Sequence, residues 1–160
     1  MNKIIVIGCP GSGKTTLSNK LGEKLGIQVY HLDDWQTLPK EDFINKQNEL
    51  MEGDKWVIDG NFVKTIGNRI AKADTVVFLD LSKKIVCWRF LKRSFKDFNR
   101  ERGELAGSYL KEKWGVLRYI WNFPRVEIYR IIEQCRQDKK IIVLHNPKEM
   151  KNLLAGVVVN

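Results

Sequence analysis

The 160-residue chain predicts an α/β fold in which helices cover both faces of a parallel sheet. Five short apolar runs are continuous rather than alternating, as expected for parallel strands that are buried on both faces. Helical segments separate these runs, and an alternation of strands and helices is typical of a parallel sheet. The expected strands cover residues 4–7, 28–32, 56–58, 75–79 and 140–144.

The expected helices are recognised by the spacing of their apolar residues and by their start signals. Leucines recur at every fourth residue in 14–25, Pro39 precedes the helix at 40–52, and Ser82 is a plausible cap for 82–98. A short helix is expected at 65–73. A last helix is expected after Pro124, with an apolar stripe at Ile128, Ile131, Ile132 and Cys135.

The segment 99–123 interrupts this alternation. It contains three glycines and five aromatic residues, and no simple strand or helix pattern. We therefore expect a single domain over residues 1–160, with a lid insertion over about 99–125 that is mobile or folded over a site.

Composition excludes several classes of protein. Apolar residues make up 43% and charged residues 29%, which is the balance of a soluble globular protein. No apolar run approaches the roughly 18–20 residues of a membrane span, and the first residues lack the pattern of a signal peptide. Three cysteines without CxxC spacing and two histidines do not predict structural zinc. We expect a reduced, cytoplasmic protein that does not contact a membrane, as a monomer or a homodimer.

The positive charge is local. Residues 83–140 hold 16 basic and 7 acidic residues, which accounts for the whole net charge of +9, and eight of the nine arginines lie there. Arginine dominates where phosphate is bound in a bidentate manner, so this distribution indicates an anionic partner. The alternative is a solvated basic face of a helix.

A phosphate-binding loop is the strongest signal. The run from Gly8 to Thr15 fits G-x-x-x-x-G-K-[ST] and lies between a strand and a helix, as that motif requires. Backbone N–H groups of such a loop surround phosphate, the lysine reaches the β- and γ-phosphates, and the hydroxyl binds Mg²⁺. We expect ATP and Mg²⁺ as cofactors, with Thr15 as a metal ligand and Lys14 as a catalytic residue. The predicted ATP-binding residues are Gly8, Pro10, Gly11, Ser12, Gly13, Lys14, Thr15 and Thr16.

Carboxylates follow three of the expected strands, at the edge where open α/β sheets bind ligands. Asp33 and Asp34 are adjacent, so at most one is expected to face the phosphates directly. Asp59 precedes Gly60 and is expected to be functional, whereas Asp80 also reads as a residue that starts a helix. We assign Asp33 and Asp59 to the metal, and Asp34 to the acceptor and its hydroxyl proton, while the choice of base between Asp33 and Asp34 stays open.

Two arginines of the basic stretch are four residues apart. Arg89 and Arg93 therefore share a helix face, and with Arg125 they are expected to stabilise charge on a transferring phosphoryl group. Trp35, beside the paired carboxylates, either lines an acceptor pocket or is half-buried core.

These residues together resemble the adenylate-kinase-like small P-loop kinases, and within them the family called DNA topology modulation protein FlaR. The resemblance implies a three-layer P-loop fold like that of nucleoside monophosphate kinases, with a five-stranded sheet in the order 2-3-1-4-5 and an α-helical lid. It further implies that Asp59 holds a metal-bound water, that Arg89 and Arg93 contact ATP phosphates, and that Arg125 is a looser match. The motifs that carry it are the phosphate loop, residues 31–35, 56–62 and 77–80, and Arg69, Arg89 and Arg93.

The chain also departs from those kinases. Asn61-Phe62-Val63 stands where nucleoside monophosphate kinases carry Phe-Pro-Arg, so a grip on an acceptor phosphate is missing or relocated to Arg69. Asp33-Asp34 is closer to kinases that phosphorylate a hydroxyl, such as shikimate or gluconate kinases. The sequence thus predicts a kinase of a nucleotide or other small metabolite. The alternative is an ATP-dependent nucleic-acid-binding protein or switch.

Overall fold

A computed structural model of the chain describes residues 1–98 and 106–157, with side chains described for 1–94 and 113–157. Five parallel strands form one sheet in the order β2-β3-β1-β4-β5, which confirms the predicted fold class. The strands are β1 (Lys3–Gly8), β2 (Val29–His31), β3 (Trp56–Asp59), β4 (Thr75–Leu79) and β5 (Lys140–Leu144). The central strand β1 runs beside β3 and β4, with Val6 opposite Asp59 and Gly8 opposite Leu79. All carboxyl ends therefore meet at one edge.

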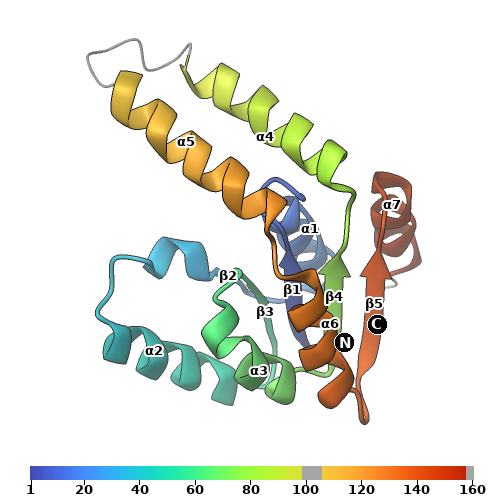
Figure 1. Cartoon of the computed structure of the whole chain (residues 1–160). Coiled ribbons are helices and arrows are strands. Elements are labelled where there is room, and N and C mark those ends of the chain that lie inside the picture. The colour runs from blue at the N-terminus through green and yellow to red at the C-terminus, as the bar shows by residue number, and fades with distance from the viewer. Residues whose placement is uncertain (99–105, 158–160) are drawn as a thin grey trace.

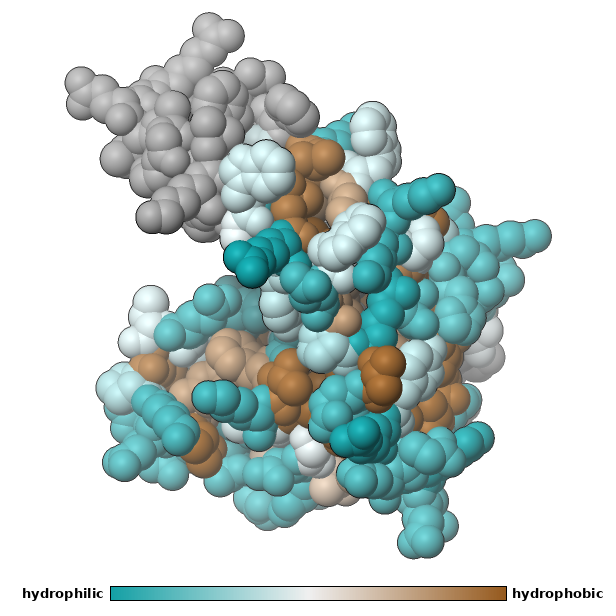
Figure 2. All heavy atoms as spheres, in the orientation of Figure 1, coloured by the Kyte–Doolittle hydropathy of each residue, from teal (hydrophilic) through white to brown (hydrophobic). Residues whose placement is uncertain are grey.

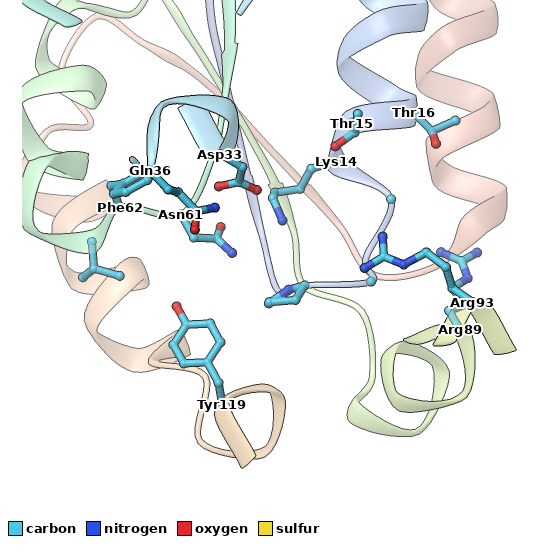
Figure 3. Close-up of a pocket in the computed structure, with 14 residues that line it drawn as sticks. Lys14, Thr15, Thr16, Asp33, Gln36, Asn61, Phe62, Arg89, Arg93 and Tyr119 are labelled. Carbon is cyan, nitrogen blue, oxygen red and sulfur yellow. The ribbon is translucent and has the colours of Figure 1, made fainter. Parts of the chain in front are cut away.

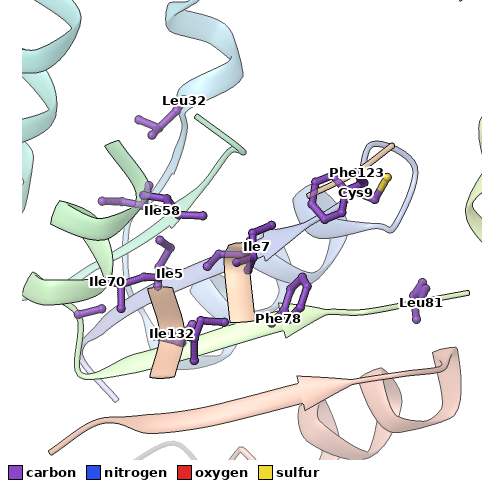
Figure 4. Packing of buried hydrophobic residues seen from close by; sticks show 14 of the residues in the cluster. Ile5, Ile7, Cys9, Leu32, Ile58, Ile70, Phe78, Leu81, Phe123 and Ile132 are labelled. Atoms are coloured by element: carbon purple, nitrogen blue, oxygen red, sulfur yellow. The ribbon is translucent and has the colours of Figure 1, made fainter. Parts of the chain in front are cut away.

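Alternate residues of β1 enter two separate cores. Ile5 and Ile7 belong to a cluster with Ile58, Phe78 and Ile132, seen closely in Figure 4. Their neighbours in sequence point to the other face, where the cluster includes Leu17 of α1 (Lys14–Leu25) and Leu144. Burial on both faces explains why the three inner strands β1, β3 and β4 are apolar without alternation, whereas the edge strands β2 and β5 are mostly half-buried.

The two faces of the sheet carry different helices (Figure 1). α1 and α7 (Pro147–Gly156) supply side chains to the core that contains Leu17. The opposite core receives side chains from α2 (Lys40–Glu52), α3 (Val63–Lys72), α4 (Lys83–Phe98), α5 (Ala106–Trp121) and α6 (Arg125–Gln134). A 3-10 turn, η1 (Leu32–Trp35), follows β2 directly.

Two elements add to the helices that local pattern predicted. α5 is a 16-residue helix within the region for which the resemblance implied an α-helical lid, and it lies beside α4. Gly115 lies in α5 on an open side, because a Cβ there would meet nothing within 4 Å. α7 was not predicted, although Asn146 caps it by accepting hydrogen bonds from the amides of Lys148 and Glu149. Residues 99–105 of the expected lid lie outside the described residues.

The N-terminus is tied to the start of β4. The Asp74 carboxylate accepts hydrogen bonds from the amides of Asn2 (2.7 Å) and Lys3 (3.0 Å) and from the Thr75 hydroxyl (2.6 Å). Burial alone would raise the pKa of Asp74, but these hydrogen bonds outweigh it and hold the pKa below its ordinary value. The ionised form of Asp74 thus stabilises this end of the sheet.

Among residues 1–98 and 106–157, no helix combines the length and the apolar character that crossing a bilayer requires.

Candidate active site

A cleft of about 560 Å³ opens at the carboxyl edge of the sheet. Figure 2 shows the surface hollowed between α5 and the lobe formed by η1 and α2. Figure 3 shows the side chains that point into it. Its lining residues are Pro10, Gly11, Gly13, Lys14, Thr15, Thr16, Asp33, Gln36, Asn61, Phe62, Val63, Arg89, Arg93 and Tyr119.

The phosphate loop adopts the conformation that its glycines allow. Gly11 (φ 82°) and Gly13 (φ 98°) both occupy the left-handed region, which side chains beyond glycine rarely adopt. Gly13 is the N-cap of α1, and no side chain caps its amides. The first turn of α1 therefore presents free N–H groups and the positive end of the helix dipole at the cleft.

Lys14 lies at the bottom of the cleft and is almost fully buried. Its ammonium donates a hydrogen bond to the carbonyl of Cys9 at 3.4 Å. Burial lowers the pKa of Lys14, while the nearby carboxylates of Asp33 and Asp59 act in the opposite direction and favour the charged form. A buried, weakly partnered ammonium of this kind attracts anionic oxygens strongly.

Cys9 is buried beneath the loop, 3.9 Å from the carbonyl of Ile120. Burial raises the pKa of its thiol to about 12, although Lys14 and Arg125 favour the thiolate. The helix N-terminus thus does not make Cys9 a reactive nucleophile, because the neutral thiol dominates at physiological pH.

The two adjacent carboxylates take different positions. Asp33 lines the cleft on the same side of the sheet edge as Lys14, and Figure 3 shows both side chains directed into it. Both residues are exposed, but Asp34 is not among the lining residues. Trp35 packs edge-on against Phe43 with 6.2 Å between ring centroids, and the Lys46 ammonium lies 4.4 Å above the Trp35 ring. Trp35 is therefore half-buried core at the base of η1.

Asp59 is buried at the end of β3 and is held by a histidine that the sequence analysis did not assign. His31 Nδ1 donates a hydrogen bond to Asp59 Oδ1 at 2.8 Å, and the other ring nitrogen of His31 lies 3.0 Å from Asn19 Oδ1. Asp59 Oδ2 is buried without a hydrogen-bond partner among the described residues. One oxygen of Asp59 is thus fixed, and the other is free to bind a ligand or its water.

Arg69 is fully buried and does not line the cleft. Its guanidinium donates hydrogen bonds of 2.8 Å to the carbonyls of Gly60 and Phe62. Gly60 needs a glycine, because its φ is 127° and a Cβ would lie 2.9 Å from the Leu32 side chain. Arg69 clamps the turn after β3, so in this structure it does not reach an acceptor as the sequence analysis expected.

Arg89 and Arg93 both line the cleft from one face of α4. Arg89 donates a hydrogen bond of 3.1 Å to the carbonyl of Ser12 and so reaches the phosphate loop. Arg93 lies near the Phe90 ring, 5.9 Å from its centroid. The structure therefore brings this pair to the loop from a helix more than 70 residues away in the sequence.

Arg125 is directed elsewhere. It forms a 3.0 Å ion pair with Asp80 and donates a hydrogen bond to the carbonyl of Leu81, and neither Arg125 nor Asp80 lines the cleft. Asp80 also accepts a 2.8 Å hydrogen bond from Tyr129. Burial, followed by this hydrogen bond, raises the pKa of Tyr129 to about 12. Asp80 therefore connects β4 to α6, in line with its expected structural role.

Several lining residues were not assigned by sequence reasoning. Gln36, Phe62, Val63 and Tyr119 belong to this group, and Asn61 was noted only as part of a turn. The carboxamide Oδ1 of Asn61 accepts a weak hydrogen bond from the Gly8 amide at 3.4 Å. The sequence signal that could have placed Asn61 at the site is the tight turn after Asp59, which begins at Gly60. Tyr119 carried no local signal, because α5 reaches the cleft only through tertiary packing.

No three His, Cys, Asp or Glu residues in the described part of the chain converge as a metal site of protein ligands alone. A metal that is held largely by phosphate and water needs fewer protein ligands. Thr15, in the first turn of α1, lines the cleft and supplies a hydroxyl oxygen for that kind of site. Asp59 is buried and is not among the lining residues, but its Oδ2, unpartnered among the described residues, supplies a second oxygen at the end of β3.

The chain is similar, over part of their length, to two proteins that are provisionally assigned as kinases. One, of Thermococcus kodakarensis, is provisionally assigned as an adenylate kinase and is 33% identical over an alignment of 106 residues, with coverage of 58% of this chain and 56% of that protein. The other, of Schizosaccharomyces pombe, is provisionally assigned as a gluconokinase and is 27% identical over an alignment of 122 residues, with coverage of 73% of this chain and 54% of that protein. The chain spans about half the length of these curated relatives, and no family model matches it.

Solved structures share the fold at low sequence identity. A shikimate kinase from Acinetobacter baumannii in complex with shikimate has a TM-score of 0.60 and 18% identity, with 97% of this chain and 89% of that chain covered. A shikimate kinase from Bacteroides thetaiotaomicron has a TM-score of 0.57 and 15% identity, with 95% and 93% covered. These likenesses show the P-loop kinase fold.

Proposed function

We propose that the protein is an ATP- and Mg²⁺-dependent phosphotransferase that transfers the γ-phosphoryl group to a hydroxyl of a small metabolite. The observation that carries this proposal is the pairing of Lys14 and Asp33 in one cleft, at the end of a free helix N-terminus. The loop and Lys14 supply an anion site, and Asp33 supplies a proton acceptor beside it. The similarity to a provisionally assigned gluconokinase and adenylate kinase supports the same reaction class.

In the proposed reaction the acceptor oxygen attacks the γ-phosphorus, and a new P–O bond forms. The bond from the γ-phosphorus to the bridging oxygen breaks, and ADP leaves with that electron pair. The hydroxyl proton passes to the Asp33 carboxylate, which lines the cleft, whereas Asp34 does not. Lys14, Arg89 and Arg93 stabilise the negative charge on the phosphoryl oxygens.

The residues present fit a magnesium ion, which would neutralise phosphate charge when bound. The Thr15 hydroxyl would be a direct ligand, and Asp59 Oδ2 would accept a hydrogen bond from the metal's water shell. His31 keeps Asp59 oriented through Oδ1. Asp33, which the sequence analysis assigned to the metal, is better placed as the base in this proposal.

α4 and α5 would form the sides of a lid. Arg89 and Arg93 enter the cleft from α4 and Tyr119 enters it from α5, so binding of ATP would draw on both helices. Closure of such a cover excludes water and so suppresses hydrolysis of ATP.

Four arginines of the basic stretch contact other parts of the chain, which weakens the alternative that they bind nucleic acid. Arg89 contacts the phosphate loop, and Arg125 pairs with Asp80. Arg130 forms an ion pair with Glu127 (3.4 Å) and Arg136 with Glu133 (3.1 Å), each three residues earlier in the sequence. A site for ATP phosphates accounts for Arg89 and Arg93 in the cleft with fewer assumptions than a nucleic-acid site.

The test is incubation of the purified chain with Mg-ATP and a pool of nucleosides, nucleotides, sugars and polyols. New phosphorylated products are identified by mass spectrometry, with Lys14→Met as the negative control. The neighbouring variants Asp33→Asn and Asp34→Asn make a matched pair, because both remove one charge from η1. Asp33→Asn is expected to lower kcat by about 10²-fold or more while ATP binding persists, and Asp34→Asn to stay close to wild type. Loss of transfer in Asp34→Asn alone would assign the base to Asp34.

A further inference from the structure

The cleft has two chemically different walls. The phosphate wall consists of the loop and the first turn of α1, with Lys14, Arg89 and Arg93 as its cations. Beside Lys14, on the side away from Arg89 and Arg93, lies the acceptor wall, which we define as Asp33, Gln36, Asn61, Phe62, Val63 and Tyr119. Figure 3 shows Asp33, Gln36, Asn61 and Tyr119 grouped on the side of the cleft away from Arg89 and Arg93. Among the described lining residues, the acceptor wall therefore carries one negative charge and no positive charge.

Two further cations lie near the acceptor wall, Arg69 and Lys46, and both have other partners. Arg69 lies behind the acceptor wall, but it is fully buried and donates to the carbonyls of Gly60 and Phe62 at 2.8 Å. Lys46, on the neighbouring helix α2, lies over the Trp35 ring and is not among the lining residues. Neither side chain is placed to bind an anionic group of an acceptor in the cleft.

The groups on the acceptor wall suit an uncharged partner. The carboxamides of Gln36 and Asn61 can both donate and accept hydrogen bonds with hydroxyls or with the edge of a heterocycle. Tyr119 adds a phenol whose pKa is raised by burial and by the negative charge of nearby groups, including Asp33, so it remains a neutral donor. Phe62 and Val63 supply apolar surface for the face of a ring. The Asp33 carboxylate would repel a phosphate or carboxylate bound beside it, because its neighbour Lys14 is engaged by the ATP phosphates in the proposed reaction.

We propose that the phosphoryl acceptor is an uncharged, hydroxyl-bearing compound, a nucleoside or a free sugar or polyol, and not a nucleotide or a sugar acid. The inference rests on the proposed phosphotransferase function and specifies its acceptor. It narrows the sequence expectation of a nucleotide or other small metabolite, because Arg69, which could have held an acceptor's phosphate, donates its hydrogen bonds to backbone carbonyls instead.

The test uses acceptor pairs whose members differ by one anionic group: adenosine with AMP, cytidine with CMP, and sorbitol with gluconate. In any pair of which at least one member is phosphorylated, we expect kcat/KM with Mg-ATP to be at least tenfold higher for the uncharged member. A nucleoside or a polyol as the better substrate identifies the source of the hydroxyl. Equal or greater activity on AMP, CMP or gluconate would overturn the inference and leave the kinase function intact. Absence of any phosphorylated product would overturn the kinase function, and this inference with it.

A charge introduced on the acceptor wall gives an independent readout. Gln36→Arg places a cation at the cleft and is expected to shift the ratio of kcat/KM within a pair toward the anionic member by at least tenfold. Thr37→Arg is the matched control, because it adds the same charge at the next, exposed residue, which does not line the cleft. An unchanged ratio in Gln36→Arg, with the fold intact by circular dichroism, would show that this wall does not contact the acceptor and would refute the proposal.

Discussion

Arg69→Met tests whether the buried arginine holds the turn after β3 or binds substrate. Arg69 is fully buried, and its two hydrogen bonds to Gly60 and Phe62 are 2.8 Å long. Hydrogen bonds from a charged group contribute about 1.5–3 kcal/mol each, so the pair contributes about 3–6 kcal/mol. Burial lowers the pKa of Arg69 from 12.5 to about 10, against the attraction of Asp33 and Asp59, and this corresponds to a cost of about 3 kcal/mol for the charged form.

Methionine fills a similar volume and removes both the hydrogen bonds and the cost of the buried charge. We therefore expect Arg69→Met to lower the free energy of unfolding by up to about 3 kcal/mol. The assay is urea unfolding followed by tryptophan fluorescence, since the chain has five tryptophans. Arg136→Met is the matched control, because Arg136 is exposed and pairs only with Glu133 on its own turn. Its change should stay below about 0.5 kcal/mol.

Kinetics separate the two roles of Arg69. A clamp on the turn that carries Asn61 should lower stability and kcat together, with a smaller change in the KM for the acceptor. Unchanged stability with a KM for the acceptor at least tenfold higher would refute the clamp and restore Arg69 to the acceptor site. Unchanged stability and unchanged kinetics would refute both roles.

Three further expectations follow from the contacts of single side chains. His31→Leu should lower kcat about 10-fold or more, with ATP affinity nearly unchanged, because Asp59 loses its positioning hydrogen bond. His31→Asn can still donate a hydrogen bond and should recover much of the lost kcat. Equal defects in both variants would argue against a positioning role. Iodoacetamide at pH 8 should modify Cys9 at least about 100-fold more slowly in the native chain than in the urea-unfolded chain, because a thiol with a pKa of about 12 has little thiolate. Peptide mapping by mass spectrometry measures both rates. The lowered pKa of Asp74 means that its contribution to stability is present above its ordinary pKa of 3.8 and is lost as the pH falls through the lower folded value. Urea unfolding between pH 2.5 and 6 should therefore show a flatter acid limb for Asp74→Asn than for wild type, and identical limbs would contradict this role.

The elements that depend only on neighbouring residues could be predicted from local patterns. Continuous apolar runs predicted all five strands, and in β1, β3 and β4 burial on both faces accounts for the lack of alternation. The phosphate loop was readable because its glycines and lysine are contiguous and need only a strand before them and a helix after them. The local signal for α7, which the sequence analysis did not predict, is the Asn146 cap directly before Pro147.

Which side chains meet in the cleft depends on how distant segments pack. Asp33 and Asp34 are equivalent in the sequence, and only the 3-10 turn after β2 directs Asp33 into the cleft. Arg69 and Arg125 resemble phosphate-binding arginines, yet packing commits one to backbone carbonyls and the other to Asp80. Tyr119 reaches the cleft from a helix that begins more than 90 residues after the loop. The physical reason is that a local pattern fixes the backbone of a segment, whereas the partner of a polar side chain depends on which distant segments the packed core places beside it.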